Sequence, residues 1–168
     1  MSFLKIPSLL LLIAAGSAAA QTVPIPATTD AQLWAGVGLE TILPTAQLGF
    51  SLPVSRLGGL TVEPRAQVEV SPVLFFGADL LLAQGNVGWY GGPSVGVTAS
   101  AGGGWRAGGV LGYRGRTREH LGFYAEGGLR YTVLNDFRVG NGGVPGDTGP
   151  HRFTFPSPSV RLGLTYRF

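Results

Sequence analysis

Apolar side chains recur at every second position along most of the chain after residue 30. The last ten residues show this most clearly, because every even-numbered position from Val160 to Phe168 is apolar, whereas Arg161 and Arg167 occupy odd positions. Successive side chains of a β-strand point to opposite faces of the sheet, so this segment has one apolar and one polar face. Eight such segments can be recognised, at residues 32–41, 46–54, 60–70, 73–83, 87–99, 105–114, 121–133 and 159–168.

Turn-forming stretches rich in glycine, proline, asparagine and serine separate these segments. Each segment is close to the roughly 9–11 residues that a tilted transmembrane strand needs, and their number is even, as in single-chain bacterial barrels. The pattern therefore predicts an all-β fold, an eight-stranded antiparallel up-and-down transmembrane β-barrel. Pro44 is expected to end the first segment, and Pro64 and Pro93, which lie inside segments, are expected to mark bulges.

Every charged residue within the eight segments falls on the polar face. These residues are Glu40, Glu63, Arg65, Glu69, Asp79, Arg106, Arg114, Glu126, Arg130, Arg161 and Arg167. Buried charges are tolerated only when they are paired, so five acids against six arginines predict a network of Arg–carboxylate bridges in the lumen. The lumen of an eight-stranded barrel is nearly filled by side chains, which favours a closed interior; a narrow ion or small-solute pore is the alternative.

Alternation alone does not tell whether the apolar faces point inward or outward. A secreted soluble barrel that binds an apolar ligand would bury them, whereas a membrane barrel turns them towards lipid. The polar faces hold many glycines and no lysine, which suits a narrow lumen better than a solvated surface. We therefore expect the apolar faces to contact lipid.

Outward aromatic residues near segment ends support the same orientation. With both termini on the periplasmic side, five of them share one interface and Tyr131 lies at the other rim. The expected membrane-interface aromatics are Trp89, Tyr113, Phe123, Tyr131, Tyr166 and Phe168. The same count of passes makes residues 134–157 a long extracellular loop, and makes 56–59 and 84–86 short periplasmic turns.

The amino-terminus has the features of an export signal. Lys5 precedes an apolar run from Leu9 to Ala15, and small residues end at Ala20, where cleavage is expected. The predicted organisation is a signal peptide at 1–20, an extended lead-in at 21–30 and the barrel at 31–168. Charged residues make up only 12% of the chain and its formal net charge is +3, with no basic cluster, so nucleic-acid binding is not expected.

The carboxy-terminal sequence Tyr166-Arg167-Phe168, an alternating strand that closes on phenylalanine, resembles the terminal strand of small outer-membrane β-barrels of the OmpA/OmpX type. The resemblance implies the outer membrane of a diderm bacterium. It also implies that the barrel-assembly machinery recognises the last strand through Tyr166 and Phe168.

Catalysis is not expected. Enzymatic barrels use a base with a nucleophile or an activated water, and the only histidines, His120 and His151, are assigned to opposite sides of the membrane. The chain has no cysteine, so thiolate metal sites and disulfides are excluded, and no cofactor or metal site is predicted. The expected role is structural or adhesin-like, with a possible extracellular partner or surface polymer bound by the loop at 134–157.

Overall fold

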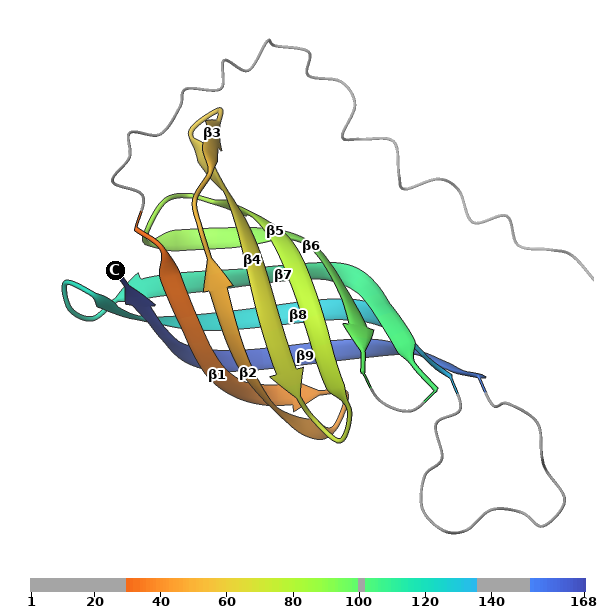
Figure 1. The fold of residues 1–168 in the computed structure, drawn as a ribbon. Coiled ribbons are helices and arrows are strands. Elements are labelled where there is room, and N and C mark those ends of the chain that lie inside the picture. The colour runs from red at the N-terminus through yellow and green to blue at the C-terminus, as the bar shows by residue number, and fades with distance from the viewer. Residues whose placement is uncertain (1–29, 100–101, 136–151) are drawn as a thin grey trace, which may run out of the picture.

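The computed structural model describes residues 30–99, 102–135 and 152–168, and their regular elements are all β-strands (Figure 1). The strands are β1 (Gln32–Glu40), β2 (Leu43–Ser51), β3 (Ser55–Leu57), β4 (Leu60–Val70), β5 (Leu74–Ala83), β6 (Gly88–Thr98), β7 (Gly104–Arg116), β8 (Leu121–Asn135) and β9 (Arg152–Arg167). The predicted signal peptide and almost all of the lead-in lie outside the described residues.

The strands form one closed antiparallel barrel. Neighbours follow the order β2-β1-β9-β8-β7-β6-β5-β4-β3, and a further pairing between β2 and β4 closes the sheet. Because β2 and β3 both pair with β4 and follow each other along one path, they make a single interrupted barrel strand. The predicted all-β, eight-stranded antiparallel barrel is therefore confirmed.

The interruption between β2 and β3 is a bulge. Ser51 faces Arg65 before it and Ser55 faces Val62 after it, so three residues on one side oppose two on the other. The bulge expected at Pro64 is therefore found, but the extra residue lies on the strand opposite Pro64, since β4 itself keeps one register along β5. The Pro64 carbonyl accepts a hydrogen bond from the Leu52 amide, so the nitrogen of Pro64 also faces the interruption between β2 and β3. The absence of an N–H there removes no regular hydrogen bond of the sheet.

The expected bulge at Pro93 is wrong. Pairing between β5 and β6 lapses opposite Pro93 but resumes at Leu82 and Gly91 in the same register. Pro44 does not end a strand either, since it lies inside β2 and pairs with Leu39. A two-residue turn before it, in which Thr41 takes a left-handed φ of 59°, already reverses the chain.

The predicted long loop at 134–157 is shorter than expected, because its two ends are strand. Leu134 belongs to β8, and β9 begins at Arg152. Residues 136–151 lie outside the described residues. The predicted turn at 56–59 is likewise partly strand: β3 and the start of β4 form a hairpin whose turn residues, Gly58 and Gly59, both have positive φ.

The start of β1 and the end of β9 lie side by side, where the Phe168 amide donates to the Ala31 carbonyl. We call this the terminal end of the barrel and the opposite one the far end. At the far end β8 and β9 run on past β1, whose pairing with β9 stops at Glu40 and Ser159 (Figure 1).

This extension of β9 contains Pro156 and Pro158. The Thr41 amide donates to the Pro158 carbonyl at 2.6 Å, so even-numbered positions of β9 direct their backbone groups away from β8. Both prolines therefore have their imide nitrogens on the edge that β1 no longer covers.

Candidate functional site: the interior of the barrel

Side chains of the polar parity point into the barrel and exclude solvent from it. Ten of the eleven predicted lumen charges are buried, and only Glu40, at the far end of β1, is partly exposed. The buried ten are Glu63, Arg65, Glu69, Asp79, Arg106, Arg114, Glu126, Arg130, Arg161 and Arg167. Alternation along each strand places them on one common face of the sheet, because adjacent strands keep these positions in register, and this face is the inner one.

The centre of the lumen holds a branched ion-pair cluster. The Arg65 guanidinium contacts Asp79 Oδ2 at 2.7 Å and Glu126 Oε2 at 2.7 Å. Glu126 also accepts from Arg161 Nη1 at 3.2 Å and from the Tyr90 hydroxyl at 3.1 Å. Both oxygens of Glu126, on β8, thus accept from donors on β4, β6 and β9, so this carboxylate links four strands across the lumen.

At the terminal end, Arg114 and Glu63 form a separate forked pair. Nη1 and Nη2 of Arg114 donate to the two carboxylate oxygens of Glu63 at 3.1 and 2.8 Å. Arg114 also donates to the Gly85 carbonyl and to Gln32 Oε1, and Glu63 accepts from the Ser51 hydroxyl. The pair therefore links β7 to β4 across the lumen and anchors the β5–β6 turn.

Towards the far end, Glu69 receives two arginines, Arg161 and Arg106. Arg106 also contacts Glu40 Oε2 at 3.0 Å, so a single guanidinium holds two carboxylates. Its other face lies on the Phe75 ring, 4.3 Å from the centroid. The central and far clusters are continuous, since Arg161 joins Glu126 to Glu69.

Two of the predicted charges are not paired as expected. Arg130 donates to the hydroxyls of Ser94 and Ser159, and Arg167 donates to the Asn86 backbone carbonyl. Among the residues that the structure describes, neither has a carboxylate partner. The prediction that the arginines would pair with carboxylates is therefore wrong for these two.

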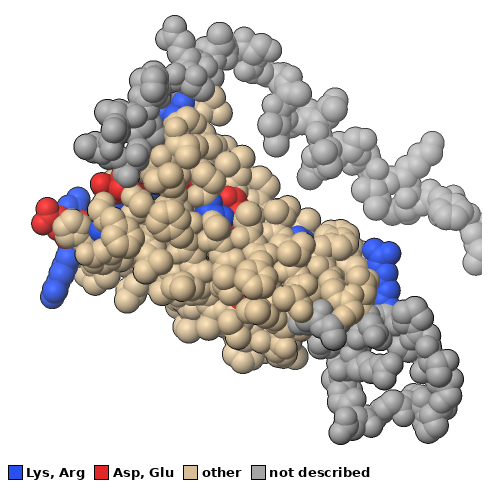
Figure 2. Space-filling view, in the orientation of Figure 1, with Lys and Arg blue, Asp and Glu red and all other residues tan. Residues whose placement is uncertain are grey.

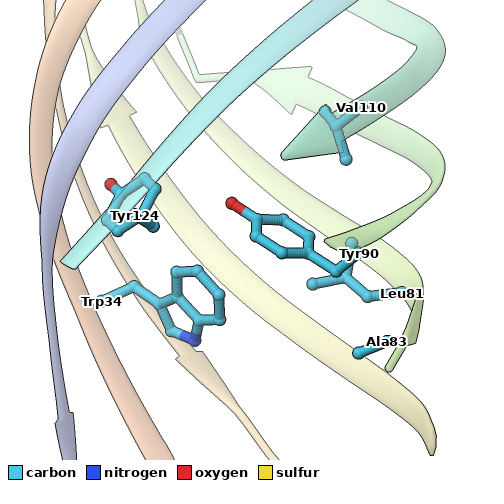
Figure 3. Close-up of a cluster of buried hydrophobic side chains, with 6 residues drawn as sticks. All are labelled: Trp34, Leu81, Ala83, Tyr90, Val110 and Tyr124. Carbon is cyan, nitrogen blue, oxygen red and sulfur yellow. The ribbon is translucent and has the colours of Figure 1, made fainter. Parts of the chain in front are cut away.

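An aromatic cluster fills the lumen between the terminal and central ion pairs (Figure 3). The Trp34 ring meets Tyr90 and Tyr124 edge to face, with centroids 5.4 and 5.1 Å apart. The Arg65 and Arg114 guanidinium groups stack on Trp34 at 4.9 and 5.6 Å. Trp34 therefore connects the two groups of ion pairs electrostatically.

Trp34 and Tyr124 share the parity of the charged residues on their strands, and the sequence alone assigned these rings no role. The signal that identifies them is the glycine opposite each ring. A Cβ on Gly36 or Gly163, which pair across β1 and β9, would collide with the Tyr124 ring or its hydroxyl. A Cβ on Gly112 would collide with Tyr90. The lumen glycines thus make room for aromatic side chains from neighbouring strands.

A second apolar cluster narrows the far end of the lumen. Val73, Phe75 and Leu134 are buried there and pack against Phe155. A cavity of about 50 Å³ remains beside them, lined in part by Glu40, Thr132 and Ser157. Since a water molecule occupies about 30 Å³ of liquid volume, this space holds one or two waters or one small ion.

The exterior of the barrel is apolar and carries the predicted aromatic residues. All six are exposed, and the visible surface is largely uncharged (Figure 2). Trp89 and Tyr113 meet edge to face across β6 and β7 near the terminal end, as do Tyr166 and Phe168 at the end of the chain. Tyr131 lies at the far end with Trp105, which the sequence interpretation missed although it shares the parity of Tyr113.

Chemistry beyond ion pairing finds little support in the described part of the chain. No group of three or more potential metal ligands occurs among the described residues. His120 lies in the turn after β7, where its ring contacts the Arg167 carbonyl at 3.2 Å, and His151 lies outside the described residues. None of the described residues belongs to a helix long and apolar enough to cross a membrane.

Comparison with protein-family models, curated proteins and solved structures finds no match to this chain.

Proposed function

We propose that this chain is an outer-membrane β-barrel of a diderm bacterium, with a closed lumen and a structural or adhesin-like role. The observation that carries the proposal is the inverted distribution of polarity. Charged and hydroxyl side chains fill the interior, while leucine, valine and aromatic side chains cover the exterior. In water such an apolar exterior would promote aggregation, whereas in a bilayer it matches the hydrocarbon chains of the lipid.

Aromatic residues at both ends of the apolar exterior support the membrane assignment. Trp89, Tyr113, Phe123 and Tyr166 lie near the terminal end, and Trp105 and Tyr131 lie near the far end. Tryptophan and tyrosine gather at membrane–water interfaces because their rings are apolar and their polar atoms can reach water. The exposed terminal residues Tyr166 and Phe168 fit recognition of β9 by the barrel-assembly machinery.

The filled lumen favours a closed barrel over a pore. Apolar rings and ion pairs alternate along it, and the cavity at the far end is too small to be a channel. A charged interior also disfavours a soluble barrel that binds an apolar ligand. The hairpin of β8 and β9, which projects past β1 at the far end, offers a platform for contacts with a partner or surface polymer.

Lipid exposure can be tested with single cysteines, because the chain has none of its own. Leu129→Cys and Leu162→Cys, each labelled with a fluorophore in reconstituted vesicles, should be quenched strongly by bromine atoms deep in the acyl chains. Arg118→Cys, in the turn after β7, is the matched control and should be quenched weakly. Equal quenching at all three positions, or recovery of the protein in the soluble periplasmic fraction, contradicts the membrane assignment.

Closure of the lumen is tested separately by planar-bilayer recording. The reconstituted barrel should show no steady conductance above that of the bilayer. A stable ohmic conductance would support the alternative of a narrow ion or small-solute pore while leaving the membrane assignment intact.

A further inference from the structure

Arg130 stands apart from the other arginines deep in the lumen. Arg65, Arg106, Arg114 and Arg161 each contact at least one carboxylate. Arg130 is as deeply buried, at 1% exposure, yet it donates only to Ser94 Oγ at 3.0 Å and Ser159 Oγ at 3.2 Å. Its Nη2 has no partner among the described residues. A buried guanidinium without a carboxylate partner lowers the stability of the fold unless a negative charge binds next to it.

The geometry points to a binding site for one small monovalent anion, such as chloride, at Arg130, Ser94 and Ser159. Each serine hydroxyl accepts from Arg130, which leaves its own O–H free to donate. Together with the N–H groups of Nη2, the site offers donors from β6, β8 and β9, and an anion is the ligand that accepts from all of them.

The lumen holds six arginines and five carboxylates, an excess of one positive charge. Two of the arginines, Arg130 and Arg167, have no carboxylate partner among the described residues. Arg167, the other arginine without a carboxylate, lies near the terminal end, where it donates to the Asn86 carbonyl in the β5–β6 turn. Arg130 is therefore the one of the two that lies deep in the lumen, where its guanidinium contacts hydroxyls and no carboxylate of the described residues.

A small cavity lies next to this site, towards the far end of the lumen. Thr132 and Ser157 line the cavity of about 50 Å³, and Ser157 is the cross-strand partner of Arg130.

The test uses the mature chain folded in detergent micelles. Sodium chloride is titrated against sodium gluconate at constant ionic strength, and the thermal midpoint is followed by near-ultraviolet circular dichroism. We expect a saturable rise of roughly 4 °C by 200 mM chloride, with bromide acting alike. Arg130→Gln should abolish the rise, whereas the exposed control Arg118→Gln should retain it.

Should Arg130→Gln fail to fold, the double variant Ser94→Ala/Ser159→Ala keeps the arginine and removes both hydroxyls, and it should weaken the chloride response at least tenfold in midpoint concentration. Crystals grown in bromide should show anomalous density within hydrogen-bonding distance of Arg130. Absence of a chloride-specific rise in the wild-type protein, its persistence in both variants, or water in place of bromide overturns the site. None of these outcomes depends on whether the barrel resides in a membrane.

Discussion

The Arg114–Glu63 pair is suited to measuring how much a buried ion pair contributes to the stability of the barrel. Among the described residues neither partner contacts another ionised group, and both side chains are at most 1% exposed. Glu63→Gln keeps the shape of the side chain and removes its charge, leaving the Arg114 guanidinium buried without a counter-ion. Removing one partner of a buried pair costs about 3–5 kcal/mol of stability, and Arg114→Met should cost a similar amount.

The double variant Glu63→Leu/Arg114→Met separates two explanations of that loss. Replacing a whole buried pair by apolar side chains of similar volume is often nearly neutral, because neither charge is then desolvated. Arg114 additionally donates to the Gly85 carbonyl at 3.1 and 2.6 Å, so the double variant should remain about 1 kcal/mol below the wild type. The expected order of stability is therefore wild type, double variant, then both single variants.

Urea unfolding in detergent or lipid, followed by tryptophan fluorescence, measures these differences. With an m-value of about 2 kcal/mol/M, each single variant should lower the unfolding midpoint by about 2 M and the double variant by about 0.5 M. Arg118→Gln, in the exposed turn after β7, should leave the midpoint unchanged. Single variants that lose less than about 1 kcal/mol, or a double variant as unstable as the sum of the singles, would refute the view that uncompensated charge dominates the loss.

Three further predictions concern the rings and the outer surface. Gly163→Val should reduce the folded fraction sharply on heat-modifiability gels, because its Cβ meets the Ala35 carbonyl and the Tyr124 ring, whereas Gly103→Asn, in a turn with open space, should fold normally. Trp34→Ala should lower stability by about 3–5 kcal/mol in urea titrations and produce a measurable bilayer conductance, and an unchanged, silent barrel would show that the ring does not seal the lumen. Leu162→Arg, on the outward face of β9, should cost about 2–4 kcal/mol in lipid, and a loss below about 0.5 kcal/mol would argue against its contact with hydrocarbon.

The alternation of the sequence was sufficient to predict the number of strands and which residues share a face of the sheet. Leu162 and Arg161 lie on opposite faces because side-chain direction alternates along a strand, whereas the glycines and the absence of lysine on the polar faces indicated which face lies inside. The bounds of β4, Leu60–Val70, could also be predicted, because turn-forming residues flank the strand at both ends. The positions of the chain reversals were harder to predict from the sequence. Proline usually indicates a strand end, but Pro44 and Pro156 lie inside strands, at positions where no neighbouring strand requires their backbone N–H.

The partners inside the lumen could not be predicted from the sequence. Which arginine reaches which carboxylate depends on the tilt and stagger of the strands, which place Arg161 of β9 against Glu69 of β4 across the barrel. Parity alone treats Arg130 and Arg161 alike, although one binds hydroxyls and the other carboxylates. The roles of Trp34 and Tyr124 also required the fold, because the glycines that accommodate Tyr124 lie on other strands.

The prolines at the far end of β9 bear on how copies of this protein meet one another. Closure of the sheet pairs each barrel strand with a neighbour on both sides along most of its length, but the projecting part of β9 pairs only with β8 among the described residues. Such an edge is a template on which a neighbouring chain can polymerise. Pro156 and Pro158 remove two successive donors from it, and the Pro158 oxygen is already engaged by Thr41. Copies of the chain that meet at their far ends therefore find no backbone donor at these two positions with which to pair as strands.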